Sequence, residues 1–124
     1  MNKIVYNACY GGFGLSEQAM LRYAELKGIK LYVEKDSFCT YYWTNPEATI
    51  EEFDKYQEYY FEGDFDRHDP ILVQVVEELG REKASHEFAN ISIYETENNA
   101  YRIDEYDGYE TVVTQSNQDW IIIK

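Results

Sequence analysis

The chain has 124 residues and a formal net charge of −13, with 24 acidic residues against 11 basic ones. This length suffices for one domain with its own hydrophobic core, without help from disulfides or metal ions. The excess of negative charge excludes the basic surface that DNA- and RNA-binding proteins need, and it disfavours adsorption to anionic membranes. We therefore expect a partner protein with a basic surface, and no direct binding to nucleic acid or membrane.

Cysteine and histidine are too sparse to suggest a metal centre. Cys9 and Cys39 are the two cysteines, His68 and His86 stand apart, and neither CxxC nor HExxH occurs. We expect no metal and no cofactor. The chain shows no signal-like beginning and no apolar run of about 20 residues, so we expect an intracellular protein with reduced thiols.

The first third of the chain predicts a strand, a helix and a second strand. The apolar segment 3–9 predicts a strand, and the turn at 10–14 holds three glycines within four positions. Ser16 fits the N-cap of a helix over 17–27. Residues 29–33 predict the next strand.

Residues 34–66 differ from the rest because carboxylates and aromatic rings are concentrated there, and we interpret them as an acidic, aromatic-rich insertion. Asn45 and Pro46 predict the start of a helix that ends at Gly63. Two interpretations of its outer face stay open: a solvated surface, or a docking face for a basic partner. The docking face would comprise Glu51, Asp54, Glu58, Tyr59, Glu62, Asp64 and Asp66.

The clearest helix of the chain follows this segment. Asp69 fits its N-cap and Pro70 its first residue, and Gly80 is expected to end it. Residues 81–87 are polar and predict a loop. Alternation of apolar and polar residues predicts a strand over 88–94.

The C-terminal part predicts a hairpin. Asp107 and Gly108 are a strong signal for a two-residue turn between strands at 101–106 and 109–114. Residues 120–123 predict a last short strand.

This order of elements indicates an α+β fold. We expect a single domain over 1–124, with a mixed or mostly antiparallel sheet and two or three helices packed on one face.

The glycine-rich turn is the first candidate site. Gly11, Gly12 and Gly14 precede a helix N-terminus, where backbone N–H groups can face an anion. The pattern is not GxGxxG, and it lacks the Gly-Lys-Ser/Thr end of a P-loop. A tight structural turn and a ligand site both stay open, and Phe13 must either tuck under the helix or face a ligand.

Cys9 lies just before this turn, where a helix N-terminus favours a thiolate. A nucleophile also needs a base, and only His68 or His86 could supply one by folding close. The alternative is a buried thiol in a core strand. We expect no catalytic residue.

The predicted hairpin register places Glu105 directly opposite Glu110. Like charges in that position repel, so the two carboxylates could share a proton, bind a cation or await a basic partner. The alternative is that both spread into solvent.

Arg67 is one of few cations in an acidic neighbourhood. A structural ion pair is its simplest role, and an anion contact for the glycine-rich turn is the alternative. In the second case one ligand site would draw on three segments. Its residues would be Cys9, Tyr10, Gly11, Gly12, Phe13, Gly14, Ser16, Arg67, Asp69, Glu105, Asp107 and Glu110.

Three segments, 7–16, 67–80 and 101–110, resemble a family of small uncharacterised proteins of tailed phages and prophages. Segment 7–16, Asn-Ala-Cys-Tyr-Gly-Gly-Phe-Gly-Leu-Ser, is the most specific of the three. The resemblance implies a phage or prophage origin and action in the cytoplasm of a bacterial host. It implies no particular activity, because no catalytic or binding residue is assigned in that family.

We hypothesise a non-enzymatic phage accessory protein that binds and inhibits a host macromolecule through an acidic, tyrosine-rich surface. Imitation of DNA charge and inhibition of a defence factor are two forms of this hypothesis. The alternative is a small-ligand or nucleotide-binding protein, a sponge or a small enzyme, that uses the glycine-rich turn.

Overall fold

The structure is a computed structural model that describes residues 1–37, 39–61 and 65–114. Its helices and strands confirm the predicted α+β fold of one small domain. In chain order they are β1 (Asn2–Asn7), α1 (Glu17–Lys27), β2 (Tyr32–Lys35), β3 (Thr40–Trp43), α2 (Phe53–Tyr56), α3 (Pro70–Ala84), β4 (Ile91–Thr96), β5 (Arg102–Tyr106) and β6 (Tyr109–Val113).

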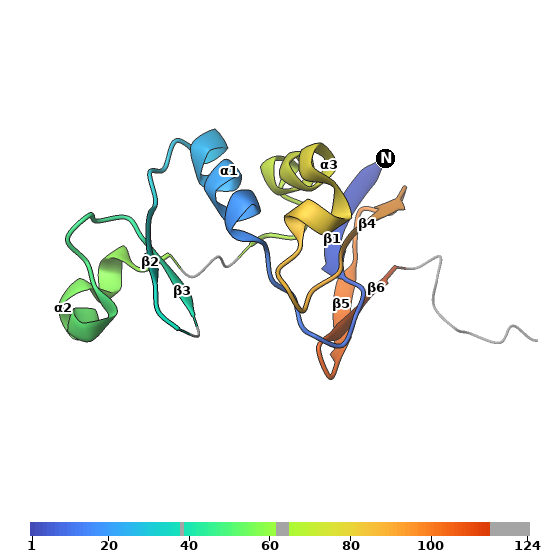
Figure 1. The fold of residues 1–124 in the computed structure, drawn as a ribbon. Coiled ribbons are helices and arrows are strands. Elements are labelled where there is room, and N and C mark those ends of the chain that lie inside the picture. Colours follow the sequence, from blue (N-terminus) through green and yellow to red (C-terminus); the bar gives the residue numbers. More distant parts are fainter. Residues whose placement is uncertain (38, 62–64, 115–124) are drawn as a thin grey trace, which may run out of the picture.

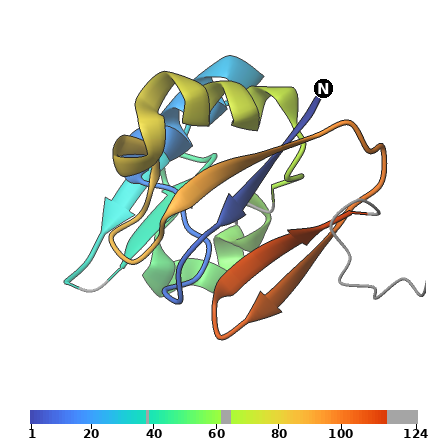
Figure 2. The ribbon, with the colours of Figure 1, turned by 90° about the vertical axis from the view of Figure 1, so that its right-hand side faces the viewer.

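The strands pair antiparallel in three two-stranded ladders, β1 with β4, β2 with β3 and β5 with β6, where a single sheet was expected. Figure 2 shows β1 between β4 and the β5–β6 hairpin, and β1 contacts β6 without a ladder of its own. Helices α1 and α3 pack on each other, and α3 covers β1 and β4. The main core lies between them and includes Val5, Met20, Leu72, Val75 and Ile91.

A second, smaller core supports the segment around α2. Trp43, Ala48 and Tyr56 are buried there and pack with neighbouring tyrosines. Figure 1 shows α2, β2 and β3 on one side of the molecule and the other strands on the far side of α1 and α3. Trp43 and Tyr56 are thus buried in this second core, whereas Tyr42, Phe61 and Phe65 pack against the main core.

Two helix predictions are confirmed at their starts. Ser16 caps α1 by accepting a hydrogen bond from the backbone N–H of Ala19. Asp69 caps α3, with Pro70 as the first residue. Gly80 has a positive φ of 80° and breaks the helical geometry as expected, but a further turn follows it up to Ala84.

The start of the helix near Asn45 was placed wrongly. The side chain of Asn45 accepts from the N–H of Glu47, and its carbonyl accepts from the N–H of Ala48, which closes a turn instead. Thr49 is the N-cap of the short 3₁₀ turn that leads into α2. Sequence analysis also missed β3 and placed β2 and β4 about three residues too early. The expected helix end at Gly63 and the strand at 120–123 lie outside the described residues.

Candidate functional site

The glycine-rich turn is packed against two other loops. A Cβ atom on Gly11 would lie 1.6 Å from the carbonyl oxygen of Phe88, so only glycine fits there. A Cβ on Gly108, in the hairpin turn, would lie 2.5 Å from the carbonyl oxygen of Tyr10. The loops at 8–14, 86–90 and 106–109 thus meet at one end of the molecule (Figure 1). Close backbone approach, rather than an anion cradle, accounts for Gly11 and Gly108.

Arg67 is bound by Glu110. Its two terminal nitrogens lie 2.6 Å and 2.8 Å from the two carboxylate oxygens, which is the bidentate geometry of a strong ion pair. The guanidinium also stacks on Phe13, with its central carbon 3.7 Å from the ring centroid. Glu110 is 6% exposed and the side chain of Arg67 is 21% exposed, so the carboxylate is buried and the guanidinium is largely covered. The geometry supports a structural ion pair for Arg67 rather than an anion contact, because Glu110 and Phe13 already occupy its guanidinium.

The same pair completes the free edge of β1. One oxygen of Glu110 accepts the backbone N–H of Asn7 at 2.8 Å. The carbonyl of Arg67 accepts the N–H of Val5, also at 2.8 Å. A side chain and a loop carbonyl therefore take the hydrogen-bonding positions of a third strand beside β1.

The opposition of Glu105 and Glu110 is confirmed, but the two carboxylates do not form a site. They are paired in the β5–β6 ladder as the turn signal predicts. Glu105 bends back and accepts the N–H of Gly108 at 2.7 Å, whereas Glu110 faces inward to Arg67. Asp107 takes a positive φ of 52° in the turn itself. Each carboxylate has its own partner, so the expected proton or cation sharing has no geometric support.

Cys9 has acceptors as neighbours, not a base. Its sulfur lies 3.1 Å from the carbonyl oxygen of Phe88 and 3.4 Å from the amide oxygen of Asn7. His68 is occupied elsewhere, with Nδ1 2.7 Å from the hydroxyl of Tyr101. A nucleophilic role for this thiol has no support in the geometry.

Asp69 belongs to a separate polar cluster in the core. Its carboxylate accepts from the hydroxyl of Tyr23 at 2.7 Å and lies 2.9 Å from Nζ of Lys27. Burial raises the pKa of Asp69, but the hydrogen bonds from Tyr23 and Lys27 together outweigh burial and hold this pKa below its ordinary value. Asp69 and Ser16 act as helix caps, so they are not joined with Arg67 in one ligand site.

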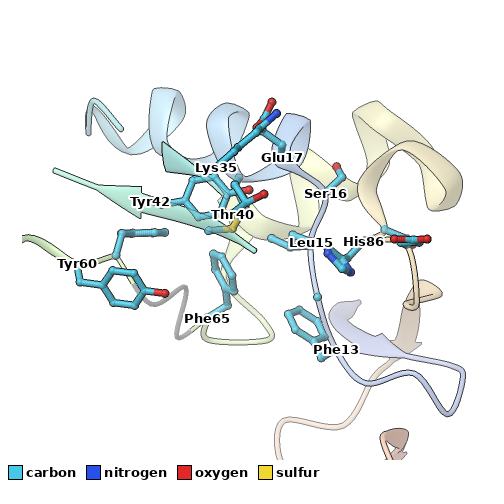
Figure 3. Close-up of a pocket in the computed structure, with 15 residues that line it drawn as sticks. Phe13, Leu15, Ser16, Glu17, Lys35, Thr40, Tyr42, Tyr60, Phe65 and His86 are labelled. Atoms are coloured by element: carbon cyan, nitrogen blue, oxygen red, sulfur yellow. The ribbon is translucent and has the colours of Figure 1, made fainter. Parts of the chain in front are cut away.

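An open cleft lies on the other side of Phe13, between the main core and the second core. Its volume is about 470 Å³, within the usual range of ligand sites. Figure 3 shows the rings of Phe13, Tyr42, Tyr60 and Phe65 around it, with Glu17 beside Lys35. The described lining residues are Phe13, Gly14, Leu15, Ser16, Glu17, Met20, Lys35, Thr40, Tyr42, Tyr60, Phe61, Phe65, Ser85, His86 and Glu87.

The electrostatics of this cleft favour positive charge. Lys35 is the only lysine or arginine among the described lining residues, and its Nζ lies 2.7 Å from Glu17. Glu87 adds a carboxylate with no lysine or arginine of the lining to balance it. Burial and the carboxylate of Glu17 raise the pKa of Tyr42, so its hydroxyl stays protonated. Of the residues proposed from sequence, Phe13, Gly14 and Ser16 border this cleft.

A tyrosine patch covers the outward face of the hairpin. We use this name for Tyr10, Tyr106 and Tyr109, whose exposed fractions are 66%, 77% and 37%. The ring centroids of Tyr10 and Tyr109 lie 5.2 Å apart, and the three tyrosines line a hollow of about 340 Å³ together with Asp104, Glu105 and Thr111. Phe88, on the adjoining loop, is 65% exposed.

The acidic surface predicted around α2 is divided. Glu51, Asp54 and Glu58 are exposed on the second core, but Tyr59 is half-buried within that core. Asp66 is on a different part of the chain, 2.8 Å from His68. Glu62 and Asp64 lie outside the described residues.

Most residues of the cleft and two of the three tyrosines of the patch were not among the expected site residues. The run Thr40–Trp43, rich in aromatic and β-branched residues between Asp36 and Asn45, carried a strand signal that would have revealed one wall. Tyr106 and Tyr109 follow from the hairpin register, which places them side by side on the face opposite Glu110. His86 and Glu87 carried no comparable signal.

Comparisons with models of protein families, with curated protein sequences and with solved structures found no match for this chain. Within residues 1–37, 39–61 and 65–114, no helix is long and apolar enough to cross a membrane. The same residues contain no group of three or more His, Cys, Asp or Glu side chains arranged to hold a metal ion.

Proposed function

We propose that this protein is a non-enzymatic binding protein that docks a basic partner protein on the tyrosine patch. The observation that carries the proposal is that three tyrosine side chains from two loops are exposed together beside carboxylates. Tyrosine provides large contact area at low entropic cost and is enriched at the centres of interfaces. A large exposed aromatic group is uncommon on a surface without a partner.

The charges around the patch favour a basic partner. Asp104, Glu105 and Asp107 surround the tyrosines, and Arg102, the one nearby cation of the hairpin, lies 2.9 Å from Asp104. The net charge of −13 adds a long-range field that accelerates association with a basic surface. In the described part of the chain, the surface around α2 exposes carboxylates and one aromatic ring, that of Phe53 at 37%, whereas Tyr56 is buried and Tyr59 half-buried. It therefore offers fewer exposed rings than the tyrosine patch, and we favour the solvated interpretation there.

The sequence resemblance supports the biological part of the proposal. A protein of phage or prophage origin would meet its partner in the cytoplasm of the bacterial host. Occupying a basic surface inhibits a host enzyme or defence factor, and it imitates DNA where that surface binds DNA. The small-ligand alternative at the glycine-rich turn has less support, because Arg67 is bound and the turn is packed.

The test compares two surfaces of the same protein. Immobilised protein is exposed to bacterial lysate at low and high salt, with a Tyr10→Ser/Tyr106→Ser variant beside the wild type. A Glu51→Gln/Asp54→Asn/Glu58→Gln variant is the control, because it removes charge from α2 and leaves the patch intact. We expect the tyrosine variant to lose a captured protein that the control retains, and high salt to weaken capture. Equal capture by both variants, or no capture at either salt, contradicts the proposal.

A further inference from the structure

We propose that the cleft beside Phe13 receives an arginine side chain, with its flanking residues, from the partner that docks on the tyrosine patch. This inference rests on the proposed function and adds the residue type that the partner must present. The cleft and the patch share the loop at 8–14, and the neighbouring loop at 86–90 borders the cleft. Phe13 and Gly14 of the first loop line the cleft, and Tyr10 of the same loop belongs to the patch. Glu87 also lines the cleft, and it precedes the exposed Phe88 in the second loop.

The walls of the cleft suit a planar cation. Aromatic rings attract a guanidinium through their negatively charged faces, and they stack on its plane. The chain already contains one example, since Arg67 stacks on Phe13 at 3.7 Å. Phe13 is in turn tilted against Phe65, with ring centroids 6.3 Å apart, so it links the Arg67 contact to the cleft.

The charge of the cleft selects a cation over an anion. Glu17 and Glu87 contribute two carboxylates, and Lys35 balances only the first. The carboxylate of Glu87 has no lysine or arginine of the lining beside it, so it can accept from a guanidinium N–H. A phosphate would meet the carboxylate of Glu17 in the first turn of α1, where Ser16 already binds a backbone N–H.

The size of the cleft favours a segment of chain over a single ion. Its volume of about 470 Å³ exceeds one side chain and fits a short peptide around an arginine. Arginine fits better than lysine, because its planar head can stack on a ring and donate to a carboxylate at the same time.

The first test uses a short peptide on the full chain. Acetyl-Ala-Arg-Ala-amide is titrated into isotope-labelled protein, and the same peptide with citrulline, a neutral isostere of arginine, is titrated in parallel. We expect backbone amide signals of Phe13, Gly14, Thr40 and His86 to shift, with at least about tenfold weaker binding of the citrulline peptide. Equal binding of both peptides, or shifts confined to Tyr10, Tyr106 and Tyr109, overturns the inference.

The second test places one charge change inside the cleft and one outside it. Glu87→Lys reverses a charge at the rim, and Glu82→Lys makes the same change on the exposed last turn of α3. We expect Glu87→Lys to weaken the arginine peptide about tenfold while Glu82→Lys leaves it within about twofold. Equal weakening by both variants shows only a general charge effect and overturns the inference. If the wild-type protein does not bind the arginine peptide while patch-dependent capture is intact, the inference about the cleft is refuted and the proposed function stands.

Discussion

The two sides of Phe13 use similar residues in opposite ways. On one side Arg67, Glu110 and the edge of β1 are joined by hydrogen bonds that satisfy every charge involved. On the other side the rings of Phe13, Tyr42, Tyr60 and Phe65 line an open cleft. We call the side of Arg67 and Glu110 the closed side and the side of the cleft the open side. The sequence features that look most like a binding site lie on the closed side, and the surface available to a ligand lies on the open side.

The comparison shows that a charged residue near a glycine-rich turn is informative only once its partner is known. Glu110 and Arg67 are separated by 43 positions in the sequence, and their bond decides that neither is free for a ligand. Buried ion pairs of this kind tolerate the loss of one partner poorly, because the other charge stays buried and unpaired. The closed side should therefore respond to substitution through stability, and the open side through binding.

The largest effect on the free energy of unfolding is expected when the ion pair between Arg67 and Glu110 is broken. Glu110→Ala leaves Arg67 and the N–H of Asn7 without their acceptor, and we expect a loss of about 3–5 kcal/mol in the free energy of unfolding. Glu105→Ala removes the carboxylate directly opposite on the ladder, which is exposed, and should cost about 0.5–1 kcal/mol. Urea unfolding measures both. Similar losses for the two variants would mean that the ion pair does not hold the closed side together.

The next largest loss of stability is expected from substitutions in the glycine-rich turn. Gly11→Ala forces the carbonyl of Phe88 to move, and we expect a loss of about 2–3 kcal/mol. At Gly12 an added Cβ meets nothing within 4 Å, but φ is +89°, so Gly12→Ala should cost about 1 kcal/mol through backbone strain alone. Thermal unfolding of the two variants separates close packing from strain. A larger loss at Gly12 would contradict the packed turn described above.

Asp69 provides a pH-dependent test away from Phe13. Its pKa is lowered in the folded state, so it contributes stability above its ordinary value of 3.8 and loses that contribution as pH falls through the folded value. Asp69→Asn keeps a capping oxygen but removes the charge, and we expect a loss of about 1–2 kcal/mol near pH 7. The difference from the wild type should vanish below the folded pKa, as denaturant unfolding at several pH values will show. A difference that is independent of pH would mean that the charge of Asp69 adds nothing.

The smallest effect tests the electrostatics of the open side. Burial and Glu17 both raise the pKa of Tyr42, so Glu17→Gln should lower that pKa without restoring its ordinary value. Titration of the tyrosine ring carbon signals by NMR measures the change. Glu25→Gln, a neighbouring helix position outside the cleft, is the control and should leave Tyr42 unchanged. An unchanged pKa of Tyr42 in the Glu17→Gln variant would mean that the Glu17 carboxylate does not act on the cleft.

Local signals predicted local structure well. The caps Ser16 and Asp69 and the turn at Asp107 and Gly108 were identified because each depends on a few adjacent residues. The strand β3 was missed because the whole of 34–66 was interpreted as one acidic, aromatic-rich insertion, although Thr40–Trp43 carries a strand signal of its own. The cleft was not predicted because its walls come from segments whose distance in space has no local signature.

The way in which β1 is completed has a consequence for association between copies. An unpaired strand edge is a template on which a strand of another molecule can add, and it is a common route to aggregation. Here the backbone N–H groups of Val5 and Asn7 already donate to Arg67 and Glu110. A carboxylate at that edge also presents no N–H of its own to an approaching strand. One buried ion pair thus keeps this strand from recruiting a neighbour, and it does so without adding a strand to the fold.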